Sequence, residues 1–307
     1  MDAIVGYTGF VGSNICAGRE FDYKFNSKNI KDAYGLKPDL LVYAGLRAEK
    51  FLANNAPERD YALIKEAEEN IKRIMPKKLV LISTIDVYKR PTGVNEDSKI
   101  DTENLHPYGL NRYRLEQWVR ENCSDALIIR LPALFGIHLK KNFLYDYIHV
   151  IPAMLKESKY QELQAKEKSL DKYYVRQDNG FYKCRTLNEE ENVYLKAAFQ
   201  KLGFTALNFT DSRSRFQFYP LSRLAGDIET ALKYQLKLWN PATEPISAEE
   251  IYKALTGNSF CNELANAPAD YDYRTLYADI FHGNGGYIMN KTEILHAIVE
   301  YCKEELQ

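Results

Sequence analysis

The sequence lacks an excess of charge of either sign, a long hydrophobic run and closely spaced cysteines. Its 41 lysines and arginines balance 42 aspartates and glutamates, which argues against nucleic-acid binding because that function usually requires a basic surface. No apolar run approaches the roughly 20 residues of a membrane-spanning helix. A first strand that begins at residue 3 would leave no room for a signal peptide, and five scattered cysteines suit a reducing compartment. We therefore expect a cytoplasmic protein that does not enter a membrane.

The sequence also lacks a recognisable metal-binding motif. Its five histidines are far apart, and none has the spacing of a metal-ligand pair. They are His106, His138, His149, His282 and His296. We therefore expect no metal site.

Three glycines near the start of the chain form the most informative pattern. Gly6, Gly9 and Gly12 lie in GYTGFVG, after the apolar run 3–5 and before apolar residues at helical spacing. This context predicts nucleotide binding, with Gly6 allowing a tight turn, Gly9 admitting a pyrophosphate and Gly12 letting the helix pack closely. Neighbours expected to contact the pyrophosphate through their backbone are Thr8, Phe10 and Val11. The alternative is that all three are ordinary turn glycines.

Strands and helices alternate over residues 1–136. Apolar runs predict buried parallel strands at 23–26, 40–45, 79–82 and 126–132. Apolar residues three and four apart predict helices at 58–75 and from residue 106 onward. This alternation predicts an α/β fold of the Rossmann type, with a doubly wound parallel sheet.

The pattern changes after residue 143. The stretch 143–215 is rich in Lys, Glu and Tyr, has no glycine-rich loop, and includes an expected surface helix at 195–202. We expect a Rossmann domain made of residues 1–150 and about 216–245. The segments at about 151–215 and 246–307 are expected to form a smaller, mostly helical substrate-binding domain.

The ends of the second and third strands bear on the choice of coenzyme. NAD-binding domains usually carry an acid after the second strand, whereas this chain has Asn26, Ser27 and Lys28. A serine and a lysine can receive a 2′-phosphate that an acid would repel, which favours NADP over NAD. Alternatively, these residues begin a solvated loop. After the third strand, the small residues Ala44 and Gly45 would let the backbone approach the coenzyme.

Four motifs, in the right order, carry a resemblance to a known family. They are GYTGFVG at 6–12, ISTIDVY at 82–88, YGLNRYRLE at 108–116 and RLPALFG at 130–136. With these motifs the chain resembles the extended short-chain dehydrogenases/reductases, in particular the NAD(P)-dependent epimerase/dehydratase family that acts on nucleotide sugars. The likeness is weaker at PISAEEIYKALTG, residues 245–257, and residues 143–215 match little of the family.

The resemblance implies roles for individual residues. Tyr108 takes the place of the family's acid/base tyrosine, and Thr84 that of the hydroxyl that polarises the same oxygen, with Ser83 as the fallback. Arg112 stands where the family has a lysine. Its charge would lower the pKa of the tyrosine by up to about 3 units at an effective dielectric constant near 20. An arginine could also hold a ribose, but it cannot relay a proton. Coenzyme contacts are implied for Ser83, Tyr108 and Arg112.

Further departures from the family limit the expected chemistry. Asp86 is the only acid that follows Thr84, because Ile85 occupies the place of the first dehydratase acid. We therefore expect an epimerase or a reductase rather than a dehydratase. Asp60 and Ala133 stand where the family often has asparagines. The alternative is a weak or inactive NAD(P)-binding protein that serves as a sensor or interaction partner.

The resemblance also suggests a substrate contact and an assembly. Lys140, Lys141 and Asn142 could hold the diphosphate of a nucleotide sugar, although paired loop lysines are more often simply solvated. Members of the family often pair through a helix bundle that includes the tyrosine helix, which implies a homodimer.

Overall fold

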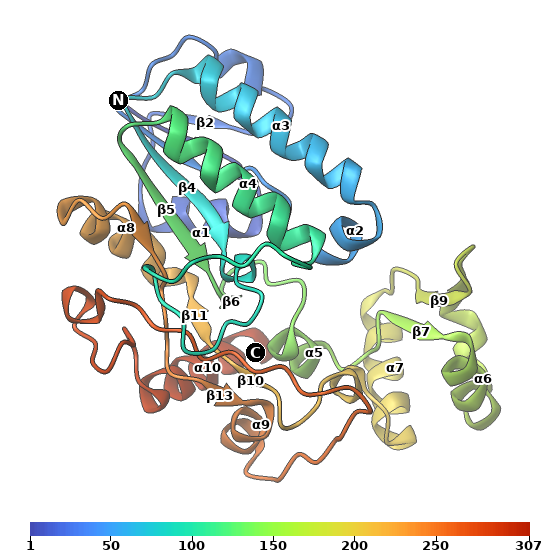
Figure 1. Ribbon diagram of the computed structural model, residues 1–307. Coiled ribbons are helices and arrows are strands. Elements are labelled where there is room, and N and C mark those ends of the chain that lie inside the picture. Colours follow the sequence, from blue (N-terminus) through green and yellow to red (C-terminus); the bar gives the residue numbers. More distant parts are fainter. The chain divides into compact units, whose positions relative to one another are not determined.

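The computed structural model describes all residues from 1 to 307 and divides into two compact units (Figure 1). Unit 1 comprises Met1–Leu139, Arg215–Ser247 and Ala269–Ile298. Unit 2 comprises Lys140–Ser214, Ala248–Pro268 and Val299–Gln307. The last helix, α10 (Lys291–Leu306), contributes residues to both units.

A six-stranded parallel sheet forms the centre of unit 1. In spatial order its strands are β12 (Leu238–Trp239), β5 (Ala126–Leu131), β4 (Lys78–Thr84), β3 (Leu40–Tyr43), β1 (Asp2–Val5) and β2 (Tyr23–Phe25). Every neighbouring pair is parallel. All residues of β3 and β5 are buried, because layers on both faces of the sheet exclude solvent. The predicted α/β fold with a doubly wound parallel sheet is confirmed.

The helices of unit 1 cover both faces of this sheet (Figure 1). They are α1 (Phe10–Gly18), α2 (Lys50–Asn55), α3 (Pro57–Ile74), α4 (Pro107–Asn122) and α8 (Leu224–Lys233). Helices α3 and α4 pack together in front of the sheet, and α1 packs against α8. Helix α3 begins with a proline, which suits the first helical position, and ends where Met75 adopts a left-handed conformation before Pro76.

Shorter elements complete unit 1. Strand β6 (Ala133–Phe135) pairs in parallel with β11 (Phe218–Pro220), and β10 (Arg215–Phe216) pairs antiparallel with β13 (Ile246–Ser247). Its 3-10 helices are η1 (Ile30–Ala33), η2 (Ile85–Val87), η5 (Leu221–Arg223) and η6 (Ala278–Phe281). Gln217 separates β10 from β11, because its buried amide donates to the carbonyls of Thr243 and Tyr273.

Unit 2 contains a three-stranded antiparallel sheet that the sequence analysis did not anticipate. Its strands, in spatial order, are β7 (Met154–Lys156), β9 (Phe181–Cys184) and β8 (Tyr174–Arg176). Its helices are α5 (Phe143–His149), α6 (Glu157–Lys166), α7 (Glu189–Leu202), α9 (Ala248–Thr256), η3 (Lys168–Lys172) and η4 (Ala206–Phe209). The expected surface helix at 195–202 is the last part of α7, which exposes Val193, Tyr194 and Lys201 and buries Leu195 and Phe199 in the core of this unit.

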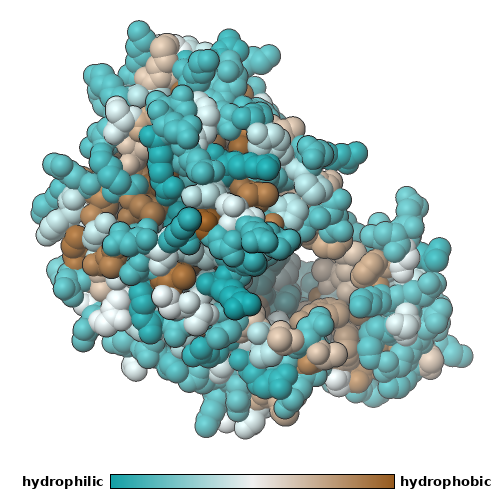
Figure 2. Space-filling view, in the orientation of Figure 1, coloured by the Kyte–Doolittle hydropathy of each residue, from teal (hydrophilic) through white to brown (hydrophobic).

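The face of the molecule shown in Figure 2 is mostly hydrophilic, with apolar side chains in small groups. None of the helices has both the length and the apolar composition needed to cross a bilayer. Nowhere do three or more His, Cys, Asp or Glu side chains lie where they could hold a metal ion together.

Candidate functional site

The glycine-rich turn between β1 and α1 is packed closely against neighbouring backbone. The N–H of Gly6, which has a φ of +92°, donates to the carbonyl of Phe25 at 2.7 Å. A Cβ atom at Gly6 would lie closer than 3.0 Å to the backbone of Ala44, and one at Gly12 would lie closer than 3.0 Å to the backbone of Gly6. Only glycine therefore fits at these two positions without a shift of the backbone.

The start of α1 leaves backbone N–H groups available for a ligand. The first hydrogen bond of the helix runs from the N–H of Ser13 to the carbonyl of Gly9 at 2.8 Å, so the N–H groups before it have no partner in the helix. These groups belong to Phe10, Val11 and Gly12. Thr8 and Gly9 are exposed beside them. Because a helix N-terminus with free N–H groups attracts anions, this turn fits the pyrophosphate of a dinucleotide.

The ends of β2 and β3 flank this turn, because β1 lies between those two strands. Ala44 directly follows β3, and Gly45 is exposed. After β2, the side-chain oxygen of Asn26 accepts the N–H of Lys28 at 2.9 Å, while Ser27 and Lys28 are exposed. The structure therefore brings these predicted residues to the edge of the sheet where the glycine-rich turn lies.

Tyr108 and Thr84 meet at the carboxyl end of β4. Helix α4 is capped by His106, whose ring nitrogen accepts the N–H of Gly109 at 3.0 Å. A glycine at this position lets α4 approach η2, since a Cβ atom there would lie closer than 3.0 Å to the carbonyl oxygen of Asp86. This approach places the Tyr108 phenol beside the Thr84 side chain, whose Oγ1 accepts the N–H of Asp86 at 3.2 Å.

The pKa of the Tyr108 phenol is raised above its ordinary value, chiefly because the side chain is buried. The positive charge of Arg112 and the hydrogen bond with Thr84 lower the pKa, while the negative charges of Asp86 and Asp60 raise it. The expected effect of the arginine is confirmed, since its charge lowers the pKa of Tyr108, but the net pKa is raised. Burial outweighs the guanidinium, and two carboxylates offset its charge.

Arg112 forms an ion pair with a buried carboxylate. Its Nη1 donates to both oxygens of Asp60, at 3.0 and 2.9 Å, and its Nη2 donates to the carbonyl of Arg47 at 2.7 Å. Asn111 Nδ2 also donates to Asp60, at 2.9 Å. Arg112 and Asp60 are only 3% and 4% exposed, and the guanidinium carbon lies 4.6 Å from the centre of the Tyr108 ring. Both terminal nitrogens of the arginine thus already bond within the protein.

Ser83 belongs to a buried polar cluster rather than to the tyrosine. Its Oγ donates to Glu116 at 2.6 Å, and Nη2 of Arg130 donates to the same carboxylate at 2.6 Å. All three side chains are buried. Of the two adjacent hydroxyls at the end of β4, Thr84 is therefore the one that lies beside Tyr108.

Asp86 has two partners that the sequence analysis did not identify. Lys50 Nζ donates to its Oδ1 at 2.9 Å, and the hydroxyl of Tyr271 donates to the same oxygen at 3.1 Å. Lys50 opens the short helix that follows β3, and Tyr271 comes from the last segment of unit 1. The only signal for Lys50 was its place after a strand that ends at this edge of the sheet, and nothing local pointed to Tyr271.

The residues expected to hold a diphosphate lie in unit 2. Lys140 and Lys141 are exposed. The side-chain oxygen of Asn142 accepts the N–H groups of Leu144 and Tyr145, at 3.0 and 3.2 Å, and so caps α5. This contact gives Asn142 a structural role. Apart from Lys140, Lys141 and Asn142, the predicted site residues are all part of unit 1.

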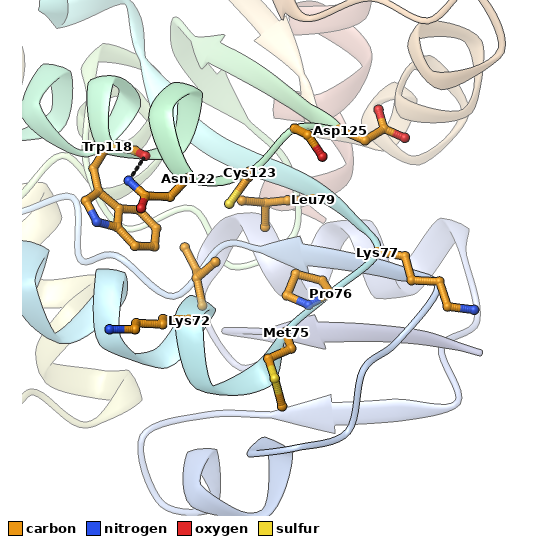
Figure 3. Close-up of a pocket in the computed structure, with 11 residues that line it drawn as sticks. Lys72, Met75, Pro76, Lys77, Leu79, Trp118, Asn122, Cys123 and Asp125 are labelled. Carbon is orange, nitrogen blue, oxygen red and sulfur yellow. Dashed lines mark hydrogen bonds between the residues drawn. The ribbon is translucent and has the colours of Figure 1, made fainter.

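A cavity of about 330 Å³ opens at the other edge of the sheet (Figure 3). It is lined by the end of α3, the end of α4 and the start of β4, including Met75, Trp118, Cys123 and Leu79. Because β4 runs away from this cavity toward Thr84, the cavity is separate from the Tyr108 site.

Comparisons with known proteins bear on the fold. No protein-family model and no curated protein sequence matches the chain, but solved structures do. A dTDP-4-dehydrorhamnose reductase from Bacillus anthracis, in complex with NADP, has a TM-score of 0.62 and 15% identity, covering 99% of this chain and 97% of that one. The Bordetella bronchiseptica enzyme WbmG, in complex with NAD and UDP, has a TM-score of 0.61 and 13% identity, with coverages of 99% and 94%.

A UDP-galactose 4-epimerase is similar to the same degree, with a TM-score of 0.61 and 13% identity over 100% of both chains. Identities this low establish a common architecture and leave the reaction open. Over nearly their whole lengths, this chain and these solved structures share one fold.

Proposed function

We propose that this protein binds a nicotinamide dinucleotide at its glycine-rich turn and transfers hydride between that coenzyme and a nucleotide-linked sugar, as an epimerase or a reductase. The observation that carries the proposal is the place of Tyr108, which lies buried beside Thr84 at the carboxyl end of β4, in the unit whose β1–α1 turn leaves N–H groups for phosphates. Ligands of such sheets bind at the carboxyl ends of the strands. Structures of the same fold in complex with NADP, or with NAD and UDP, support these ligand classes.

Each residue has a defined task in this proposal. The N–H groups of Phe10 and Val11 orient the pyrophosphate, and the exposed Ser27 and Lys28 favour NADP over NAD. The coenzyme, when bound, supplies or accepts the hydride. Tyr108 holds and moves a proton at the sugar oxygen, and Thr84, its partner, fixes the position of that oxygen.

Calorimetric titration with the oxidised and reduced forms of NADP and NAD tests the binding step. We expect heat with at least one pair and a preference for the NADP pair. The catalytic step is tested with Tyr108→Phe, which should retain coenzyme affinity and lose at least about 100-fold in turnover. If none of the four coenzyme forms gives heat on titration, the proposal is wrong. A Tyr108→Phe protein with full turnover on a nucleotide sugar would remove the catalytic assignment alone.

A second candidate is a coenzyme-binding sensor without turnover. One observation favours it, namely that Asp60 neutralises the cation that stands beside Tyr108. Such a protein would bind NADP(H) yet leave the absorbance of the nicotinamide unchanged with every nucleotide sugar offered. The homodimer stays a prediction, which light scattering on the purified protein tests.

A further inference from the structure

The two cations at the Tyr108 site are each paired with a carboxylate. Arg112 Nη1 lies 2.9 Å from Asp60 Oδ2, and Lys50 Nζ lies 2.9 Å from Asp86 Oδ1. Both carboxylates are close enough to act on the phenol of Tyr108 through their charge. The site therefore has two ion pairs, in which the carboxylate of each pair opposes the effect of a positive charge on a phenolate at Tyr108.

The Asp60–Arg112 pair is fixed from three parts of the fold. Asp60 belongs to α3 and Arg112 to α4, and the carbonyl of Arg47, after β3, accepts from Nη2 of the guanidinium at 2.7 Å. Asn111 donates to Asp60 and to the carbonyl of Pro57. Because Asp60, Asn111 and Arg112 are all less than 5% exposed, water does not compete for these bonds. The arginine cannot leave its carboxylate without losing most of its partners.

The remaining groups that face Tyr108 add no positive charge. Thr84, at the end of β4, is a neutral hydroxyl. The ring of His106 stacks 6.4 Å from the Tyr108 ring, and its Nδ1 accepts the N–H of Gly109, which requires that nitrogen to be unprotonated. Burial, reinforced by the charge of Lys50, lowers the pKa of His106, so the ring is neutral at pH 7.

We propose that Asp60 is a positioning residue that neutralises Arg112, so that Tyr108 donates a proton to a carbonyl oxygen and does not withdraw one from a hydroxyl near neutral pH. The inference rests on the proposed function and selects one direction of hydride transfer, from the coenzyme to the sugar. Epimerisation through a keto sugar needs the tyrosine to take a proton first and return it later, whereas reduction needs only the donation. The substrate class is therefore a nucleotide-linked keto sugar, and the reaction is its reduction.

The step balances with a reduced nicotinamide coenzyme as the reductant. Hydride adds to the carbonyl carbon, the π pair of the C=O bond moves onto oxygen, and that oxygen takes the proton of the Tyr108 phenol. The coenzyme is oxidised by two electrons and the sugar is reduced by two. Solvent then returns a proton to Tyr108.

The first test needs neither coenzyme nor substrate. The wild type and Tyr108→Phe are labelled with ¹³C at the tyrosine ring carbon that bears the hydroxyl. Both proteins are titrated from pH 7 to 12, and their tyrosine signals are compared by NMR. The signal missing from the variant reports Tyr108. We expect the Tyr108 signal to keep the chemical shift of a neutral phenol up to at least pH 10, which is the ordinary pKa of a tyrosine. Conversion to the phenolate below about pH 9 would overturn the inference.

The second test changes the charge of the ion pair and keeps its shape. Asp60→Asn retains an oxygen for Arg112 but removes the negative charge, so the pKa of Tyr108 should fall by about 1 unit or more. The matched control is Asp32→Asn, an exposed carboxylate on η1, which should leave that pKa unchanged. An Asp60→Asn protein that titrates like the wild type contradicts the inference. If that variant does not fold, the wild-type titration alone decides.

The two proposals fail in different ways. If the protein binds no nicotinamide coenzyme, the proposed function is wrong, whatever the titration of Tyr108 shows. A phenolate that forms near neutral pH overturns the acid-only assignment and leaves coenzyme binding unaffected.

Discussion

Replacement of Gly12 by alanine tests whether the β1–α1 turn is built for close packing and ligand approach or is an ordinary turn. Gly12 lies in the first turn of α1, where alanine would normally be favoured over glycine by up to about 1 kcal/mol. The added Cβ would, however, lie closer than 3.0 Å to the carbonyl of Gly6 and 3.0 Å from the Cα of Tyr7. Both neighbours are backbone, so the turn itself has to move.

The two effects have opposite signs, and the clash is the larger. Overpacking of this kind costs about 1–3 kcal/mol. We therefore expect Gly12→Ala to lower the free energy of unfolding by up to about 2 kcal/mol, after the helix-propensity gain of about 1 kcal/mol is subtracted. Because the displaced turn carries the N–H groups of Phe10 and Val11, affinity for NADPH should fall at least tenfold, equivalent to about 1.4 kcal/mol.

Two matched variants make the test decisive. Gly226 lies in α8 with no atom within 4 Å of its added Cβ, so Gly226→Ala should stabilise the fold by about 0.5–1 kcal/mol and leave NADPH affinity unchanged. At Gly9 the Cβ would meet only one oxygen, at 3.3 Å, so Gly9→Ala should keep the fold and still weaken NADPH binding. Urea unfolding and calorimetry measure both quantities. If Gly12→Ala matched Gly226→Ala in stability and the wild type in affinity, our account of the turn would be refuted.

Two further predictions concern buried charges. Arg130 and Glu116 are 1% and 0% exposed and 2.6 Å apart. Arg130→Met should lower the free energy of unfolding by about 3 kcal/mol, because it removes the buried cation of this pair and leaves the carboxylate only Ser83 and the more exposed Arg120. Lys303→Met breaks an exposed pair with Glu300 and should lower the free energy of unfolding by less than about 1 kcal/mol. Urea unfolding measures both variants, and an equal loss of stability in the two would contradict the distinction between buried and exposed pairs. Burial raises the pKa of Asp146 to about 7, so the folded protein holds this proton more tightly than the unfolded chain does. Stability should therefore fall as the pH rises from about 4 to about 7. Asp146→Asn should remove that part of the pH dependence. If the wild type and the variant had the same unfolding midpoint at pH 5 and also at pH 8, the prediction would be wrong.

Much of unit 1 could be predicted because its signals are local. Strands β3 and β5 are buried along their whole length, so each reads as an unbroken apolar run. Helix α3 has one apolar face, with Ile64, Ala67, Ile71 and Ile74 buried three or four residues apart. Gly9 and Gly12 likewise report a turn whose close contacts are with Gly6 and Tyr7, neighbours in sequence, whereas Gly6 itself packs against Ala44 of another segment.

Unit 2 was harder to predict because its elements are short and depend on distant partners. Strands β7, β8 and β9 have three or four residues each, too few to establish an alternating pattern. Helix α7 carries charged residues around Leu195 and Phe199, and only the opposing β7–β9 sheet and α6 make the face of those two residues a core. The sequence analysis therefore placed this helix at the surface without identifying the face that it buries.

What the sequence determined by itself was the order of elements in unit 1 and the placement of Tyr108 and Thr84 near one sheet edge, because both follow from local pattern and motif. Only the tertiary structure decided the charges around the tyrosine. Asp60 is 52 residues from Arg112, and Lys50 is 36 residues from Asp86, and no spacing rule spans such separations. An ion pair depends on where two folded elements meet, so whether the arginine acts as a free cation or a neutralised one was settled by the packing of α3 against α4.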